Sequence, residues 1–158
     1  MTYLFMALFA AGILIADQIT KWLVVGSIPL FGTVEVLPGL FHLTYVQNTG
    51  AAWSSFQGQT WLFVLVFLVF AGFILWEFPK KRMSFTAFER WCIVAVFAGG
   101  LGNMVDRLHL GYVVDMICVD FIEFPVFNVA DCFITCGCIA MIVSLIFFNK
   151  AFWKDEKK

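Results

Sequence analysis

Charged residues are scarce in this chain of 158 residues, where they make up only 13% of the sequence. Soluble proteins carry about 25%. The formal net charge is −1, so the chain lacks the excess of Lys and Arg found in nucleic-acid-binding proteins, and we expect no nucleic-acid partner. Only two histidines are present, His42 and His109. Neither stands at a spacing typical of a Ser–His or Cys–His triad, so we interpret both as surface or interface residues.

Hydrophobic residues, by contrast, make up 62% of the sequence, including 20 Phe and 6 Trp, and the mean hydropathy is +0.92. This composition predicts an integral membrane protein. The length suits a single integral membrane domain, residues 1–158, without a separate soluble domain. The first apolar stretch lacks a basic start and is interrupted by Asp17 and Lys21, so it does not match a cleavable signal peptide.

Four apolar stretches are long enough to cross a bilayer as helices, which takes about 20 residues each. They lie at about residues 3–25, 59–78, 88–107 and 130–148. The sequence therefore predicts an all-α membrane protein with four transmembrane helices.

Lys and Arg gather around the linker between the second and third stretches and in the C-terminal tail. The loops at about 26–58 and 108–129 contain none. Because basic residues favour the cytoplasmic side, we expect both termini and the central linker in the cytoplasm and the two loops outside. The basic residues concerned are Lys80, Lys81, Arg82, Arg90, Lys150, Lys154, Lys157 and Lys158.

The two outward loops contain runs of β-branched and aromatic residues. Residues 33–37 and 40–47 are such runs, and Pro38-Gly39 separates them, which is typical of a β-hairpin. Residues 112–122 form a similar run. We therefore expect a small β-sheet on the outer face of the membrane.

The five cysteines stand at positions 92, 118, 132, 136 and 138, and most fall in the predicted helices. Their spacing is not that of a CxxC motif and no histidine lies near them, so they do not predict a metal site. We expect them to be small, buried hydrophobic side chains, and we expect neither a metal nor a cofactor.

Polar residues in or beside the predicted helices gather toward the outer side of the membrane. Asp17 and Lys21 are four residues apart and can form an ion pair on one helix face. The pair either tethers the end of the first helix or supports a polar site between helices. In segment 47–53, QNTGAAW, Asn48 precedes a run of small residues that suits tight packing.

The third predicted helix ends in a glycine-rich segment, GGLGN, at residues 99–103. Its glycines, beginning with Gly99, allow helices to approach closely, whereas a buried Asn103 needs hydrogen-bond partners. Asp106 and Arg107 follow. They either form an interfacial charge pair that ends the helix, or Arg107 orients a nearby carboxylate through two hydrogen bonds.

Two further carboxylates, Asp115 and Asp131, need an explanation because acidic groups near a bilayer are costly. Asp131 could cap the fourth helix together with Asn128, since negative charge complements a helix N-terminus. Asp115 lies in an apolar, β-like run and has no such explanation. Asp120 and Glu123 are interpreted as solvated loop charges.

Two carboxylates held close together do not both ionise easily, so one of them holds a proton. The ionised one can take a proton from water while the other hydrogen-bonds a peptide carbonyl, as in aspartic proteases.

A different reading is a small transporter or proton-conducting protein in which Asp, Lys and Arg form an ion relay. A relay should place charges through the depth of the bilayer, but here they gather near one face. An assembly scaffold is also open, although it would not need two such acids.

Four segments in this order, DQITKW, QNTGAAW, GGLGNMVDRLHLGYVVD and FNVAD, resemble the motifs of lipoprotein signal peptidase, or signal peptidase II. The resemblance covers nearly the whole chain. It implies a bacterial membrane aspartic endopeptidase that removes the signal peptide of a diacylglyceryl-modified prolipoprotein, cutting before the modified cysteine. It also implies a β-sheet cradle at the outer face of the cytoplasmic (inner) membrane. Trp53 stands where Phe is expected, and Cys132 where a small polar residue is common; neither belongs to the implied chemistry.

By motif position, Asp115 and Asp131 match the family's catalytic pair. The resemblance also implies membrane lipids as neighbours and inhibition by the cyclic peptide globomycin, and we expect a monomer. Eight further residues match the family's recurring site positions and are expected to shape the pocket and to bind the substrate backbone or lipid: Asp17, Lys21, Asn48, Gly99, Asn103, Arg107, Asn128 and Ala130.

Overall fold

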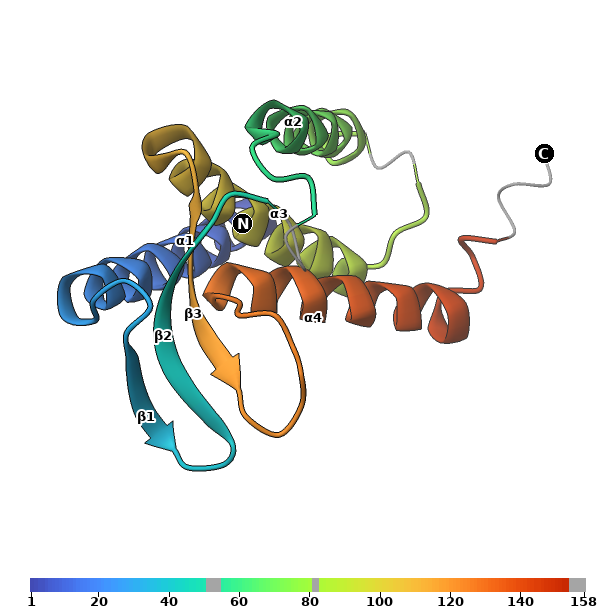
Figure 1. The fold of residues 1–158 in the computed structure, drawn as a ribbon. Helices are drawn as coiled ribbons and strands as arrows, with labels where there is room; N and C mark the ends of the chain where they lie inside the picture. The colour runs from blue at the N-terminus through green and yellow to red at the C-terminus, as the bar shows by residue number, and fades with distance from the viewer. Residues whose placement is uncertain (51–54, 81–82, 154–158) are drawn as a thin grey trace.

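The computed structural model describes residues 1–50, 55–80 and 83–153. These residues form four helices and a small antiparallel sheet (Figure 1). All four helices are long and apolar enough to cross a membrane, as predicted. Residues 51–53 of the QNTGAAW segment, including Trp53, lie outside the described residues, as do five of the basic residues used to predict orientation: Lys81, Arg82, Lys154, Lys157 and Lys158. The helices are α1 (Thr2–Ser27), α2 (Thr60–Glu77), α3 (Ala87–Leu110) and α4 (Val129–Val143), which continues as the π-helical turn η2 (Ser144–Phe148).

Helix α3 lies at the centre of the helical layer and is the most buried of the four. It begins with a capping box in which Thr86 and Glu89 each satisfy a backbone N–H of the other, and it ends at Gly111, whose φ of 82° favours glycine. A Cβ added at Gly99 would lie 2.5 Å from the carbonyl oxygen of Ala130, so the absence of a side chain there lets α3 and α4 meet closely.

The sheet consists of β1 (Thr33–Leu37), β2 (Phe41–Asn48) and β3 (Val113–Val119), paired antiparallel in the order β1-β2-β3. Its strands agree closely with the predicted runs, and Gly39 lies in the turn of the hairpin with a φ of 74°. The sheet extends from one end of the helices (Figure 1), which we call the sheet end.

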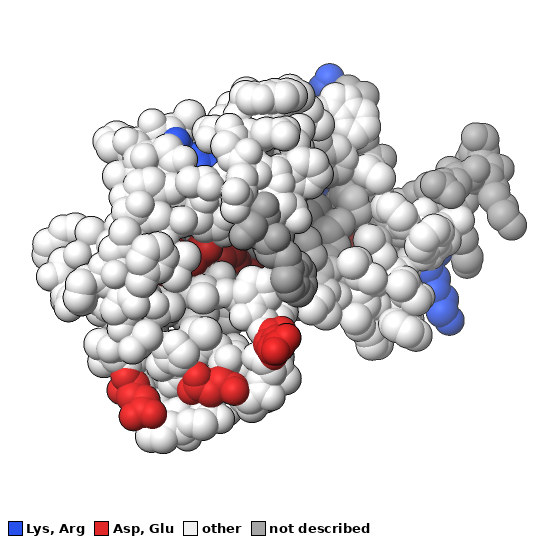
Figure 2. Space-filling model, in the orientation of Figure 1, with Lys and Arg blue, Asp and Glu red and all other residues white. Residues whose placement is uncertain are grey.

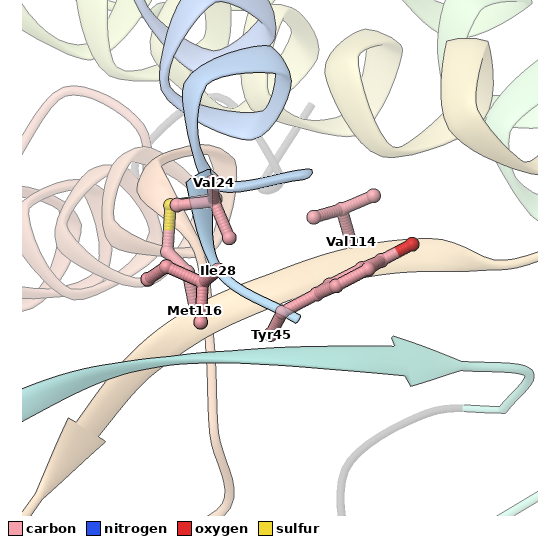
Figure 3. Packing of buried hydrophobic residues seen from close by; sticks show 5 residues of the cluster. All are labelled: Val24, Ile28, Tyr45, Val114 and Met116. Atoms are coloured by element: carbon pink, nitrogen blue, oxygen red, sulfur yellow. The ribbon is translucent and has the colours of Figure 1, made fainter. Parts of the chain in front are cut away.

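A small apolar cluster fixes the sheet to the helices. Its side chains come from the last turns of α1 and from β2 and β3, and they point toward one another (Figure 3). Burying side chains of this size contributes about 1.5–3 kcal/mol each. Two of the cluster residues, Val114 and Met116, belong to β3. Because side chains alternate along a strand, Asp115 between them lies on the other face. The members are Val24, Ile28, Tyr45, Val114 and Met116.

A second set of buried polar residues lies at the opposite, far end of the helices, where the sequence analysis predicted none. Glu77 of α2 receives two hydrogen bonds from Arg90 of α3, at 2.7 and 3.0 Å. Glu89 accepts hydrogen bonds from Ser144 at 2.8 Å and from Asn149 at 2.7 Å. We call these five residues the far-end cluster. The prediction that polar groups gather only toward one side is therefore wrong.

Two smaller expectations also need correction. Among the cysteines only Cys92 is buried, while Cys136 and Cys138 are exposed on α4 and the other two are half-buried, so most are not core residues. Asp120 is not simply solvated, because its carboxylate lies 2.6 Å from the His42 ring across β2 and β3. The cysteines were expected in the core because their neighbours in the sequence are apolar. In a membrane helix, however, an apolar face contacts lipid as readily as protein.

Candidate active site

Asp115 and Asp131 line the same pocket, which has a volume of about 510 Å³. Asp115 comes from β3 and Asp131 from the first turn of α4. Asp115 is only 3% exposed. In Figure 2, acidic side chains are visible at the bottom of a hollow in the middle of the molecule's face. The fold therefore brings together the two carboxylates singled out in the sequence.

Asp131 is held at the start of α4 by a capping box. Its Oδ2 accepts the backbone N–H of Asn128 at 3.1 Å, while its own backbone N–H donates to Asn128 Oδ1 at 3.0 Å. Its Oδ1 accepts a hydrogen bond from Asn103 Nδ2 at 2.7 Å. The predicted capping role is confirmed. It does not exclude a chemical role, because the carboxylate also faces the pocket.

Asp115 is held by two amides. Its Oδ1 accepts from Asn128 Nδ2 at 2.7 Å and its Oδ2 from Asn48 Nδ2 at 2.9 Å. Asn128 therefore contacts both carboxylates. Burial raises the pKa of Asp115 from 3.8 to about 6, against the two amide hydrogen bonds, which favour the charged form. A carboxyl group with this pKa can exchange a proton near neutral pH.

Behind the carboxylates lies a buried ion cluster. The Lys21 ammonium is 2.9 Å from Asp17, as the helical spacing predicted, and 2.9 Å from Asp106. It also donates to Asn103 Oδ1 at 3.0 Å, which turns the amide NH₂ of Asn103 toward Asp131. Asp17 accepts the backbone N–H of Ala130 at 3.0 Å. The pair thus supports a polar site between helices, rather than only tethering α1.

Arg107 does not orient a carboxylate directly. Its guanidinium donates to the carbonyl oxygen of Gly50 at 2.8 Å and to that of Asn103 at 3.4 Å. The ring of Phe63 lies beneath it, 4.2 Å from the guanidinium carbon to the ring centre. Among the described residues neither reading left open for Arg107 is seen, since Asp106 pairs with Lys21 and Arg107 instead connects the segment after β2 to α3.

The ten predicted site residues separate into two groups. Asn48, Asn103 and Arg107 line the pocket with the two aspartates. The others lie behind it, where they hold the aspartates or, at Gly99, allow α3 and α4 to approach. The residues behind the pocket are Asp17, Lys21, Gly99, Asn128 and Ala130.

The sequence interpretation missed the apolar walls of the pocket. Residues 124–127 form one wall, and Cys132, Thr135 and Cys136 of α4 form another. The helical spacing from Asp131 could have identified the α4 wall, since these residues share its face. The loop wall has no signal in the sequence. Cys132, considered a neutral departure, is therefore part of the pocket.

The site is equipped for proton transfer to and from water or a peptide. The described residues contain no group of three or more His, Cys, Asp or Glu side chains placed to hold a metal. Both carboxylates instead accept hydrogen bonds from amides and face a largely apolar pocket. Burial of this kind favours the protonated form of a carboxyl group, and a carboxyl group that gains and loses a proton can act as a general acid or base.

Comparison with known proteins agrees with this geometry. Residues 9–147 match the family model described as signal peptidase (SPase) II. The lipoprotein signal peptidase of Latilactobacillus sakei subsp. sakei (strain 23K) is 42% identical over 138 residues, which cover 87% of this chain and 91% of that protein. The lipoprotein signal peptidase of Streptococcus thermophilus (strain CNRZ 1066) is 40% identical over 143 residues, covering 89% and 86%.

Solved structures give the same result. A structure described as a bacterial membrane enzyme superposes with a TM-score of 0.85 at 31% identity and covers 92% of this chain and 90% of its own. A second structure described in the same words gives 0.81 at 32% identity, covering 91% and 94%. The chain therefore belongs to the signal peptidase II family, membrane proteases that remove signal peptides from lipoproteins.

Proposed function

We propose that this protein is an aspartic endopeptidase that cleaves diacylglyceryl-modified bacterial prolipoproteins just before the lipid-modified cysteine. The observation that carries the proposal is the joint placement of Asp115 and Asp131 in one pocket, each held by amides and linked through Asn128. The elevated pKa of Asp115, about 6, supports a pair that can take up and release a proton near neutral pH.

In the proposed mechanism the ionised member of the pair removes a proton from a water molecule, and the resulting hydroxide attacks the peptide carbonyl carbon. The protonated member donates a hydrogen bond to the carbonyl oxygen. After the tetrahedral intermediate forms, a carboxyl proton passes to the leaving amine and the C–N bond breaks. The neighbouring amides of Asn48, Asn103 and Asn128 hold the two carboxylates in place throughout.

The pocket suits a substrate that joins a peptide to a lipid. Its polar groups are at the carboxylates, and its walls, residues 124–127 and the Cys132 face of α4, are apolar. Acyl chains can therefore remain among membrane lipids while the scissile bond reaches the carboxylates. The peptide must be extended there, because a helix hides its carbonyls in hydrogen bonds. Globomycin, a cyclic peptide, would occupy the same pocket of a monomeric enzyme.

We place the protein in the bacterial cytoplasmic (inner) membrane, with both termini in the cytoplasm and the sheet end toward the outer face. Lys80 and Lys150 support this orientation, because both are exposed and lie near the far end of the helices. A C-terminal alkaline phosphatase fusion should be inactive. An active fusion would place the C-terminus outside and contradict the orientation.

The test is cleavage of a diacylglyceryl-modified prolipoprotein by purified wild type, Asp115→Asn and Asp131→Asn. Gel filtration in detergent checks that each variant is folded. Asp120→Asn is the control, because it removes a carboxylate of the sheet that does not line the pocket. We expect both pocket variants to lose cleavage and the control to keep it. Cleavage by either folded pocket variant would remove that aspartate from the mechanism.

A further inference from the structure

We propose that Gln18 and Asp106 are positioning residues that, together with Asp17 and Lys21, hold the two catalytic aspartates at a fixed separation. We call these four residues the brace. The inference rests on the proposed function, because it assumes that Asp115 and Asp131 carry the reaction. It assigns a role to two residues that lie within the motif segments but are not among the ten expected site residues.

The brace has one arm for each aspartate. Asp17 Oδ1 accepts the backbone N–H of Ala130 at 3.0 Å, and Ala130 directly precedes Asp131. Asp106 Oδ2 accepts the backbone N–H of Val114 at 3.0 Å, and Val114 directly precedes Asp115. In each arm a carboxylate thus accepts the backbone N–H of the residue just before a pocket aspartate, once at the start of α4 and once in β3.

Two side chains of α1 tie the arms together. The Lys21 ammonium lies 2.9 Å from Asp17 and 2.9 Å from Asp106. Gln18 Nε2 donates to the same two residues, at 3.2 Å to Asp17 Oδ2 and 3.0 Å to Asp106 Oδ1. Because the arms are tied twice, a shift of β3 relative to α4 must break hydrogen bonds in the brace.

The three charged residues of the brace are buried, and Gln18 is half-buried. Asp17 is 0%, Lys21 3% and Asp106 3% exposed. A Cβ added at Gly102 would lie 2.5 Å from Asp17 Oδ2, so the absence of a side chain at Gly102 lets α3 pass close to this carboxylate. Charges buried in this way are costly unless they are fully paired. Their pairing here therefore opposes any movement that would separate Lys21 from Asp17 or Asp106.

None of the four brace residues lines the pocket. They therefore act on the reaction through other groups, namely the backbone before each aspartate and the amide of Asn103, which Lys21 orients. Loosening the brace should lower kcat, because the carboxylates lose their alignment. It should leave KM nearly unchanged, because the pocket walls remain.

The separation of the carboxylates has its own signature in the pH profile. Two acids close together titrate in two widely separated steps, and the steps approach each other as the acids move apart. Activity requires one proton on the pair, so the plot of kcat against pH should be bell-shaped. A loosened brace should make this bell narrower, which means that kcat is high over a smaller range of pH. Other charged or titratable groups around the pair are Lys21 and Asp17 from α1, Asp106 and Arg107 from α3, and Cys132 from α4.

The experiment compares Gln18→Met and Asp106→Asn with wild type, using a diacylglyceryl-modified prolipoprotein as substrate across a pH series. Gln18→Met keeps the length of the side chain and removes its hydrogen bonds. We expect kcat to fall on the order of 10- to 100-fold in Asp106→Asn and less in Gln18→Met, with little change in KM and a narrower bell in both. Asp115→Asn and Asp131→Asn are run beside them.

Glu89→Gln is the matched control. Glu89 is also a fully buried carboxylate of α3, but it belongs to the far-end cluster. It should lower thermal stability without narrowing the bell. If Asp106→Asn does not fold, Gln18→Met carries the test alone, because Gln18 is only half-buried.

Three results would overturn the proposal. The first is that the brace variants keep the wild-type kcat and the wild-type pH profile while Asp115→Asn and Asp131→Asn are inactive. That result would contradict the role of the brace and leave the proposed function intact. A loss of kcat equal to that of Glu89→Gln, at unchanged bell width, would show that the brace only stabilises the fold. Cleavage by either Asp115→Asn or Asp131→Asn would defeat the proposed mechanism and the brace with it.

Discussion

The two ends of α3 carry two buried polar clusters, and Glu77 in one is held differently from Asp115 and Asp131 in the other. In the far-end cluster, Glu77 binds the Arg90 guanidinium directly through two hydrogen bonds. At the sheet end, Asp115 and Asp131 accept hydrogen bonds from amides only, among the contacts of the described residues. The nearest ammonium, that of Lys21, is separated from Asp131 by the amide of Asn103.

The difference separates a carboxylate that stabilises the fold from one that can react. Direct contact with a cation favours the charged form of a carboxylate. An amide holds a carboxylate just as firmly in space, but it changes the proton affinity much less. Asp115 thus combines firm placement with a raised pKa, whereas Glu77 is placed by a direct ion pair. Residues 91–98 between them are all apolar, which gives no support to a proton relay along α3.

The largest effect should come from making the sheet end resemble the far end. Asn48→Lys places an ammonium beside Asp115, which lowers the pKa of that carboxyl and leaves both aspartates ionised at neutral pH. We expect kcat to fall by about 10²- to 10⁴-fold, the usual contribution of general acid–base catalysis. Asn48→Leu, which removes the amide without adding charge, is the control. Equal activity in the two variants would show that the missing cation is unimportant.

The reverse experiment removes the cation from the far end. Arg90→Met leaves Glu77 buried without its partner, which should destabilise the protein by about 3–5 kcal/mol. The measurement is an unfolding titration in mixed micelles. The folded fraction should keep the wild-type kcat, and Glu77→Met/Arg90→Met should recover most of the stability. A fall in kcat of the folded protein would mean that the far-end cluster contributes to the reaction.

The pH dependence of stability sharpens the comparison further. The pKa of Asp115 is raised from 3.8 to about 6, so the folded protein binds this proton more tightly than the unfolded chain. Wild type should therefore lose stability relative to Asp115→Asn as the pH rises from about 4 to about 6, by up to about 3 kcal/mol, and lose no more above that range. Thermal unfolding of both proteins across this range tests it. Parallel curves would mean that Asp115 titrates normally.

The smallest expected change in stability comes from the two capping boxes, which are alike in geometry. Thr86→Ala removes the cap of α3 beside the far-end cluster and should cost about 1 kcal/mol of stability without changing kcat. Asn128→Ala removes the cap of α4, and should cost a similar stability but also most of the activity, because Asn128 contacts both aspartates. Mixed-micelle unfolding and cleavage assays on both variants measure these effects. Equal loss of activity would show that capping alone matters.

Much of the sheet end could be predicted from the sequence. The helices followed from apolar stretches of the right length, the hairpin from Pro38-Gly39, and the ion pair of Asp17 and Lys21 from their helical spacing. These are local patterns, and local patterns are visible along the chain. Asn128 and Asp131 were likewise recognised as caps because both stand at the start of an apolar run.

The remaining contacts depend on how distant segments pack. Glu77 and Arg90 stand at the ends of predicted helices, where a charge that faces water and one that faces a partner look the same in the sequence. Asp106 was open to two readings because its partners come from α1 and β3. Neither reading left open for Arg107 included its partner, because the carbonyl of Gly50 is placed by the path of the chain after β2.

The π-helical turn at the end of α4 has a consequence for how that helix tolerates change. Helix α4 is attached at both ends, through Asn128 and Asp131 at its start and through Ser144 and Asn149, which reach Glu89, at its finish. The wider turn, closed by the backbone N–H of Asn149 on the carbonyl of Ser144, takes up one residue more than an α-helical turn. One residue rotates an α-helix by about 100°. The π-helical turn therefore sets the rotation of one end of α4 relative to the other. Deleting a single residue there would leave the side chains that attach the two ends of the helix facing different directions.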